Sequence, residues 1–157
     1  MEVRIGLGLD RFVFGQTQSE IISALGPADK QYATDSGRIC LQYFDLRVEF
    51  SFSPEEENRL GWIEVYNPAA TLFGHLVVGE QVARITKLTA EALGEEPEHK
   101  DFGSLETFFF PKAWLELQVT FGRVVCVSLG VVYDERDEPI WPDRAGLTLP
   151  ACDAPGT

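Results

Sequence analysis

Positively charged side chains are scarce in this sequence: 13 Lys and Arg residues stand against 25 Asp and Glu residues, for a formal net charge of -12. Nucleic acids and anionic membrane surfaces attract clusters of Lys and Arg, so this balance argues against both as partners. It favours a basic protein partner, because opposite fields accelerate encounter and reject wrong partners. Acidity alone would also keep the chain soluble, and composition leaves that second explanation open.

Histidine is rarer still: neither His75 nor His99 has a second histidine or a cysteine two or four positions away. A metal needs convergent ligands in a fixed geometry, whereas contiguous carboxylates on a loop point in different directions. We therefore expect solvated acidic loops, with no metal and no other cofactor. The carboxylates concerned form two groups, Glu55, Glu56 and Glu57 in the first, and Glu95, Glu96, Glu98 and Asp101 in the second.

Motifs of nucleophilic catalysis are also missing. The chain has no Gly-x-Ser-x-Gly and no Cys paired by pattern with a His, and Gly6-x-Gly8 lacks the third glycine of a dinucleotide-binding loop. The sequence therefore predicts a protein that is not an enzyme and has no catalytic residues. Two carboxylates that meet in the fold could still act as general acid and base, and that alternative stays open.

Cysteine occurs three times, at Cys40, Cys126 and Cys152, and forms no Cys-x-x-Cys pair. An odd number of widely spaced cysteines is typical of reduced thiols in the cytoplasm. The first residues lack the basic and apolar regions of a signal peptide, and no apolar run approaches the roughly 20 residues that span a bilayer. We therefore expect a cytoplasmic protein without a membrane partner.

The segment from Thr17 to Pro27 predicts a short helix. Thr17 and Glu20 form a capping box, and Gly26 and Pro27 end the helix. A strand region at 3–14 precedes it, and three strands are expected at 38–44, 46–52 and 59–66. Apolar and polar side chains alternate strictly in the second of these, which is typical of a half-buried antiparallel strand.

The same order of elements recurs in the second half of the chain. Residues 70–78 parallel the opening strand region, a longer helix is expected at 79–93, and strands are expected at 105–110, 115–121 and 123–129. We therefore predict an α+β fold with two repeats of a short helix packed on an antiparallel β-meander. The first unit would span residues 1–75 and the second 76–142, and 143–157 would form a flexible tail. Whether the units share one sheet is left open.

Interaction surfaces are the remaining candidates for function. The polar faces of strands 46–52 and 115–121, together with the acidic loops, would suit a basic protein. The residues predicted to bind a partner are Arg47, Glu49, Glu55, Glu56, Glu57, Glu95, Glu96, Glu98, Glu116 and Gln118. Aromatic residues dominate binding hot spots, although each also suits a core. The aromatic candidates are Trp62, Trp114, Trp141, Tyr32, Tyr43, Tyr66 and Tyr133.

The run Gly15-x-Thr17-x-x-Glu20-Ile21-x-x-x-Leu25-Gly26-x-Ala28, followed by a meander, resembles two known patterns. These are the tandem helix-plus-meander repeats of the β-lactamase inhibitor protein fold and the single unit of BamE-type outer-membrane assembly lipoproteins. The resemblance implies an α+β fold that binds proteins through its sheet face. Pro27 comes one position early, and the chain lacks the lipobox cysteine and the cysteine pairs of those proteins, which argues against an envelope lipoprotein or a secreted inhibitor.

An acidic, non-enzymatic chain of this size is similar to the immunity proteins that bacteria pair with enzymatic toxins, including effectors of contact-dependent and type VI secretion. The analogy implies a tight one-to-one complex with a cognate toxin of basic surface, such as a nuclease or an NAD-degrading enzyme. Two alternatives stay open. One is a small-molecule-binding or enzymatic domain with a pocket between the two units, and the other is an assembly or adaptor factor.

Overall fold

The computed structural model describes residues 1–143, so the predicted tail lies outside the described residues except for Asp143. The described part contains two β-sheets and two α-helices, which confirms the mixed α+β character of the prediction. The helices are α1 (Gln18–Leu25) and α2 (Val82–Leu93), with a short 3-10 helix, η1 (Pro54–Glu56), between them.

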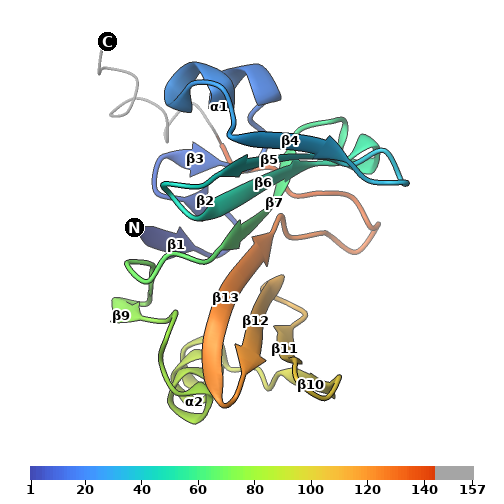
Figure 1. The fold of residues 1–157 in the computed structure, drawn as a ribbon. Coiled ribbons are helices and arrows are strands. Elements are labelled where there is room, and N and C mark those ends of the chain that lie inside the picture. Colours follow the sequence, from blue (N-terminus) through green and yellow to red (C-terminus); the bar gives the residue numbers. More distant parts are fainter. Residues whose placement is uncertain (144–157) are drawn as a thin grey trace.

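The larger sheet has eight strands in the order β10-β11-β12-β13-β7-β6-β5-β4. Each half of the chain supplies four antiparallel strands, and the two sets join where β13 pairs with β7. Figure 1 shows that the result is one continuous, strongly twisted sheet, which answers the question that the sequence left open. The strands are β4 (Lys30–Ala33), β5 (Ile39–Tyr43), β6 (Val48–Phe52), β7 (Leu60–Val65), β10 (Glu98–Asp101), β11 (Glu106–Phe110), β12 (Leu115–Thr120) and β13 (Arg123–Gly130).

A smaller sheet of short strands brings the start of the chain beside its middle. It has the order β3-β2-β1-β8-β9, in which β1 and β8 pair in parallel. The expected strand region at 3–14 is divided by turns into three short strands, and glycine is required at position 8 because a Cβ there would collide with the carbonyl oxygen of Phe12. The strands are β1 (Glu2–Arg4), β2 (Gly8–Leu9), β3 (Phe12–Val13), β8 (Thr71–Leu72) and β9 (His75–Leu76).

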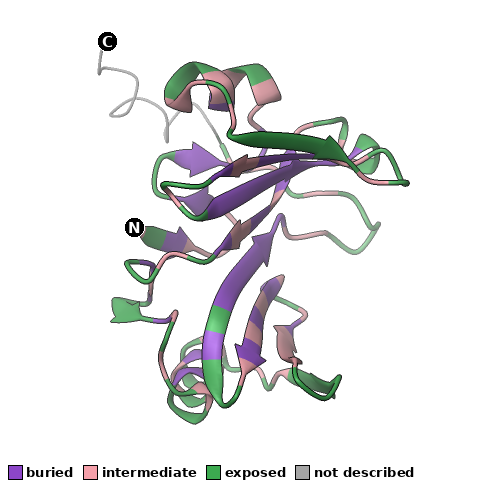
Figure 2. Cartoon of the chain, in the orientation of Figure 1, coloured by how far each residue is buried: buried purple, intermediate pink, exposed green. Residues whose placement is uncertain are grey.

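The hydrophobic core lies on one face of the large sheet. Alternate residues of the central strands, such as Leu41, Phe50 and Leu117, are fully buried there. Ile21 of α1 and Ile85 of α2 belong to the same cluster, so both helices pack on this face. Figure 2 shows β6 and β13 largely buried at the centre of the sheet, and β4 and β10 exposed at its two edges.

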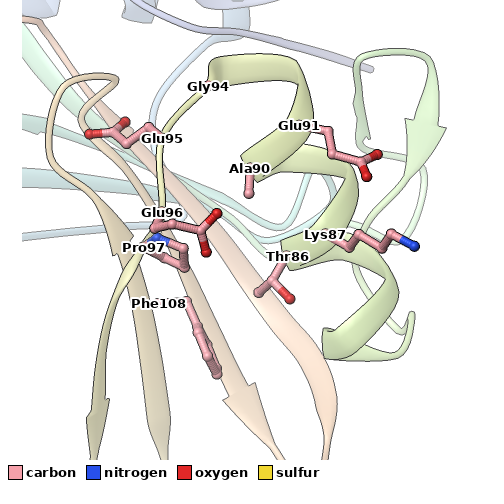
Figure 3. A pocket seen from close by; sticks show the side chains of 9 residues that line it. All are labelled: Thr86, Lys87, Ala90, Glu91, Gly94, Glu95, Glu96, Pro97 and Phe108. Carbon is pink, nitrogen blue, oxygen red and sulfur yellow. The ribbon is translucent and has the colours of Figure 1, made fainter.

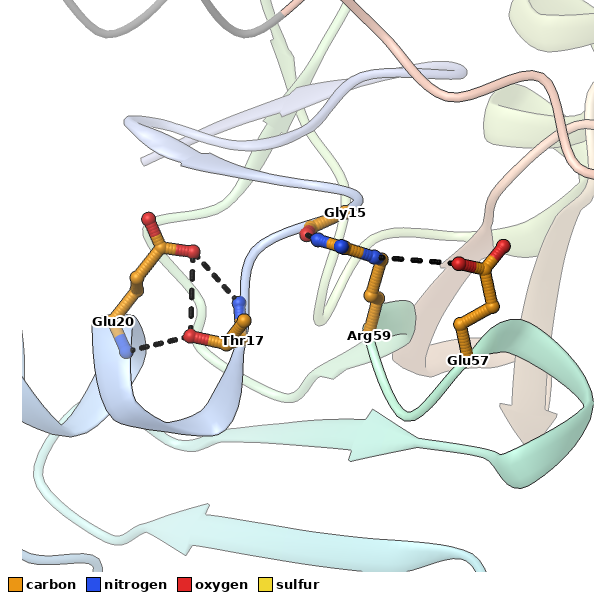
Figure 4. A network of polar contacts seen from close by, with 5 residues as sticks. All are labelled: Gly15, Thr17, Glu20, Glu57 and Arg59. Carbon is orange, nitrogen blue, oxygen red and sulfur yellow. Dashed lines mark hydrogen bonds and ion pairs between the residues drawn. The ribbon is translucent and has the colours of Figure 1, made fainter.

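The predicted capping box is confirmed at the start of α1. The Thr17 hydroxyl accepts a hydrogen bond from the Glu20 amide at 3.2 Å, and the Glu20 carboxylate accepts one from the Thr17 amide at 2.9 Å (Figure 4). The second helix begins at Val82, three residues later than predicted, and its N-cap Gln81 makes no side-chain capping bond. Both helices end at a glycine with positive φ, Gly26 and Gly94, as the sequence indicated.

The sequence pattern did not reveal two strands, β4 and β10. Each half therefore contains a meander of four strands, and the prediction of three was wrong. Both β4 and β10 are edge strands whose residues are all exposed, so they lack the apolar alternation that reveals a strand. Glu98 consequently lies in β10 rather than in a loop. Arg47 lies in the β5–β6 turn with a φ of 54°, because β6 begins only at Val48.

Candidate functional site

A row of mainly polar side chains crosses the whole large sheet on the face opposite the core, here called the open face. Directly paired residues of neighbouring antiparallel strands project from the same face, so the register defines the row. Four of its eight members are carboxylates, and we call it the acidic row. From edge to edge it consists of Lys30, Gln42, Glu49, Glu64, Ser128, Glu116, Phe109 and Glu98.

Hydrogen bonds from three aromatic side chains and one glutamine fix the two carboxylates at the centre of the acidic row. Glu49 is only 8% exposed and accepts from the Tyr32 hydroxyl at 2.9 Å and from the Gln42 amide at 2.6 Å. Glu64 accepts from the Trp62 indole at 3.1 Å and from the Tyr66 hydroxyl at 2.9 Å. These donors fix the orientation of both carboxylates and offset part of the cost of burying them.

Glu49 and Glu64 are directly opposite each other on β6 and β7. Like charges in this position destabilise a sheet, because their Cβ atoms lie only about 5 Å apart. No side-chain ion pair within residues 1–143 involves either carboxylate at 4.0 Å or less. This pair of carboxylates therefore costs folding stability that a pair of neutral polar side chains would not cost.

Beside the acidic row lies a cavity of about 360 Å³ where the two halves of the sheet meet. Its aromatic walls are Trp62 from β7, Trp114 from the turn before β12, and Tyr133, which follows β13. The Trp114 and Tyr133 rings lie with centroids 5.2 Å apart. Three carboxylates, one guanidinium and a buried hydroxyl also line it, from Glu55, Glu56, Glu64, Arg38 and Ser53.

Two glycines without side chains leave space for the walls of this cavity. A Cβ on Gly130 would lie 2.8 Å from the Trp62 ring, so the ring rests directly on the backbone of β13. A Cβ on Gly61 would collide with the Glu56 carboxylate, which in turn accepts a hydrogen bond from the Tyr133 hydroxyl. A larger residue at either glycine would displace a wall of the cavity.

Burial shifts the acid–base properties of several groups on this face. It raises the pKa of Tyr32, Tyr66 and Tyr133, and neighbouring acidic groups raise each of them further. These hydroxyls therefore stay protonated at neutral pH and act as donors. Burial also raises the pKa of the Cys126 thiol to about 12, and it raises the pKa of the Glu116 carboxyl. Cys126 is thus held as a neutral thiol, a poor nucleophile.

Seven of the ten predicted partner-binding residues lie on or beside the open face. The acidic row includes Glu49, Glu98 and Glu116, and Gln118 projects from the same side of β12 as Glu116. Glu55 and Glu56 line the cavity, and Arg47 lines a second hollow of about 270 Å³ with Gln42, Glu49 and Tyr66.

The other three predicted residues lie elsewhere. Glu57 is directed toward Arg59, with 3.8 Å between carboxylate and guanidinium, and Arg59 also donates to the Gly15 carbonyl (Figure 4). Glu95 and Glu96 follow α2 and line a hollow on the helix side of the sheet. The structure therefore does not bring the second acidic loop together with the first.

This helix-side hollow measures about 480 Å³ and lies between α2 and β11. Figure 3 shows Thr86 and Ala90 facing Pro97 and Phe108 across it, with Lys87 pointing away. One Glu95 oxygen accepts from the Lys112 amide at 2.7 Å, while the other is buried without a hydrogen-bond partner among the described residues. The hollow has few polar groups that converge on one point, so the open face is the better candidate site.

Glu64 is the central residue that the sequence reasoning missed. Its signal was present in the alternation of Trp62, Glu64 and Tyr66 with the apolar Ile63 and Val65, which places one polar and aromatic face on β7. That alternation could have identified Glu64 as a face residue. The pairing of β7 with β13, which puts Glu64 at the centre of the sheet, is a tertiary fact.

Two further findings concern the part of the chain that the structure describes. No group of three or more His, Cys, Asp or Glu residues within 1–143 is arranged to hold a metal ion. Neither helix in that range is long and apolar enough to cross a membrane.

No protein-family model and no curated protein sequence matches this chain. Among solved structures it is similar to an extracellular protein containing a SCP domain from Bacillus anthracis str. Ames, with a TM-score of 0.46 and 13% sequence identity. The match covers 73% of this chain and 42% of the other, so the chain spans less than half the length of that protein. A likeness this low carries no argument about fold or function.

Proposed function

We propose that this chain is a non-enzymatic protein-binding inhibitor, a cytosolic immunity protein that binds an enzymatic bacterial toxin one-to-one through the open face. The acidic row is the observation that carries the proposal. Carboxylates placed directly opposite each other cost stability, so a binding role explains their presence better than a folding role does. A basic surface on the toxin, such as that of a nuclease, would supply the missing counter-charges.

The breadth of the open face supports a protein partner. Eight strands about 4.8 Å apart present a surface more than 30 Å across, the scale of a specific protein–protein interface. Aromatic residues lie on this face beside the carboxylates, and such residues are enriched at binding hot spots. Phe121, which is 91% exposed at the tip of the β12–β13 hairpin, offers an apolar contact at the rim.

We also propose that the chain arose by tandem duplication of one unit. Each half places a short hairpin and a helix before a four-stranded meander, and the last strands of the two meanders pair. This arrangement supports the resemblance to helix-plus-meander repeat proteins. A duplication would explain how one sheet came to be twice as wide as a single unit could build.

The first experiment is to purify the tagged protein from its native cells and identify what remains bound. We expect one stoichiometric basic protein that is toxic when expressed alone. The variant Glu49→Gln, Glu64→Gln, Glu116→Gln should bind it at least about tenfold more weakly, because three negative charges of the acidic row are removed. It should also show a shallower dependence of affinity on salt.

A matched control removes the same charge from the helix side of the sheet, where Glu91, Glu95 and Glu96 line one hollow. The variant Glu91→Gln, Glu95→Gln, Glu96→Gln should keep affinity within about twofold, since charges on the far side of the sheet are screened. Equal losses of affinity in both triple variants would show that only the net charge of the protein matters. The open face would then no longer be supported as the binding site. Failure of any protein to co-purify at low or moderate salt would argue against the inhibitor proposal as a whole.

The cavity beside the acidic row favours a second candidate function, the binding of a small molecule between the two halves. Its lining by Trp62 from one half and Trp114 and Tyr133 from the other is the specific observation. A thermal-shift screen with nucleotides, amines and amino acids tests it, because a ligand that binds only the folded state raises the melting temperature. Stabilisation by a metabolite without any protein partner would favour this second function.

A further inference from the structure

The cavity beside the acidic row has an unbalanced charge. It is lined by three carboxylates, Glu55, Glu56 and Glu64, and by one guanidinium, Arg38, so its formal charge is -2. Among residues 1–143, no Lys, Arg or His nitrogen lies within 4.0 Å of a Glu55, Glu56 or Glu64 oxygen. Arg38 thus lines the cavity without neutralising any of the three directly.

The carboxylates of the cavity also have unused capacity to accept hydrogen bonds. An ionised carboxylate offers about four acceptor positions. Glu64 uses one for the Trp62 indole and one for the Tyr66 hydroxyl, and Glu56 uses one for the Tyr133 hydroxyl. Several acceptors on two separate carboxylates therefore remain for a ligand that carries several donors.

The aromatic walls suit a cation as well. The face of an indole attracts a positive charge within about 6 Å of its centre, and tryptophan is the best of the aromatic residues for this. One side of the Trp62 ring rests on Gly130, and Trp114 is braced by Phe109 and Tyr133, with ring centroids 5.7 Å and 5.2 Å away. The walls are therefore held in place before any ligand arrives.

Taken together, planar aromatic walls and paired carboxylates fit a guanidinium group better than a compact ammonium ion. A guanidinium is planar, stacks on aromatic rings, and presents five N–H donors in a fixed fork that matches carboxylates. We infer that this cavity binds an arginine side chain of the protein partner. The inference rests on the proposed function and adds the chemistry by which the partner is recognised.

The test uses short peptides as probes of the full-length protein. The probe is acetyl-Gly-Arg-Gly-amide, and its control replaces arginine with citrulline, which has the same shape without the charge. The measurement is the NMR shift of the indole N–H signals. The arginine peptide should shift the signals of Trp62 and Trp114 saturably and leave that of Trp141, which packs against the core, unchanged. The citrulline peptide should bind at least about tenfold more weakly.

Variants of the cavity sharpen the test. Glu56→Gln and Glu64→Gln should each lower the affinity for the arginine peptide by about tenfold. Glu57→Gln makes the same change in charge outside the cavity and should leave that affinity within about twofold. A circular dichroism spectrum like that of the natural chain, with a melting temperature that is no lower, would show that each variant folds. Equal shifts with arginine and citrulline peptides, or no shift with either, would overturn the inference.

Two arms separate this inference from the proposed function. Propylguanidinium, a free guanidinium ion with the same single charge as the arginine side chain, should bind no more tightly than the peptide, and tighter binding would overturn the assignment to a partner's side chain. If a toxin is found and the double variant Glu56→Gln, Glu64→Gln binds it as well as the natural chain does, the inference fails while the proposed function stands. If the peptide binds as expected but no protein partner exists, the proposed function fails. The cavity would then still be a site that binds guanidinium groups.

Discussion

The two halves of the large sheet differ in how their open faces are organised. In the first half, all five residues of β6 are buried, because Tyr32 of β4 and Gln42 of β5 contact Glu49 on the polar face and the hydrophobic core covers the other face. In the second half, β12 alternates between buried and half-buried residues, so its open face stays wet. The edge strands cause the difference, since β4 extends Tyr32 over Glu49 and β10 offers only exposed polar side chains.

The difference shows that similar strand order does not give a similar surface. The first half presents two carboxylates in fixed positions, Glu49 and Glu64, and each of them accepts hydrogen bonds from two donors. The second half presents Glu116 and Gln118 without such clamps from aromatic residues. A preorganised surface loses less entropy on binding, so we expect the first half to contribute most of the affinity for a partner.

The largest expected effect tests whether the halves fold as one unit. Phe50→Ala and Leu117→Ala remove fully buried side chains from the first and second half. Each should lower the free energy of unfolding by about 3–4 kcal/mol, because a cavity is left in a shared core. Urea unfolding followed by tryptophan fluorescence and by circular dichroism should give coincident single transitions for both variants. Two separate transitions would show that the halves are independent domains.

A smaller effect separates the two open faces. Glu49→Ala leaves the Tyr32 hydroxyl and the Gln42 amide without their acceptor and should cost about 1–3 kcal/mol. Glu116→Ala in the second half should change stability by no more than about 0.5 kcal/mol, since its carboxylate is half exposed. Urea midpoints at a constant m-value give both numbers. Equal costs would contradict the contrast between an ordered and a wet face.

The two helix starts provide the next comparison. Thr17→Ala removes the capping box of α1 and should cost about 1 kcal/mol. Gln81→Ala should lower the free energy of unfolding by at most about 0.3 kcal/mol, because the side chain of this N-cap makes no hydrogen bond. Gln81→Asp should instead stabilise α2 by about 0.5 kcal/mol, through a new cap and a favourable charge at the helix start. Thermal unfolding should rank the melting temperatures of the three variants in the order Gln81→Asp, Gln81→Ala, Thr17→Ala, from highest to lowest.

The smallest effect concerns the pH dependence of stability. Burial raises the pKa of Glu116, and the charge of Glu64 contributes to the rise. The folded chain therefore holds this proton more tightly than the unfolded chain does, and the ionised carboxylate costs stability above the folded pKa. Glu116→Gln should stabilise the protein at neutral pH by less than about 1 kcal/mol, given the partial exposure. The gain should shrink as the pH falls through the folded pKa, and a gain that persists in acid would contradict this cause.

Much of the secondary structure could be predicted from the sequence because it depends on local signals. The capping box of α1, the glycines that end both helices and the alternation in 46–52 are such signals, and both predicted helices and the six predicted meander strands are present within a few residues. The predicted strand regions 3–14 and 70–78 are instead divided into strands of two or three residues. The strands β4 and β10 were missed because a fully exposed edge strand has no alternation to detect. Their strand conformation is imposed by hydrogen bonds to β5 and β11.

The candidate site was predictable in part, for a similar reason. The polar side of β6 and β12 follows from period-two alternation, so Glu49, Glu116 and Gln118 were identified as face residues. The separation of Glu95 and Glu96 from Glu55 and Glu56 could not be predicted, because it depends on which side of the sheet each connection crosses.

The sequence by itself determined the acidity of the chain, the order of its helices and strands, and which side chains share a face within each strand, because these depend on composition and on neighbours along the chain. Only the tertiary structure decided that β7 and β13 pair. That pairing joins two meanders into one sheet, aligns four carboxylates in a row, and places Trp62 beside Trp114 and Tyr133 around a cavity. Such contacts link residues more than 50 positions apart, and the register that sets them is fixed by packing across the whole core rather than by any local pattern.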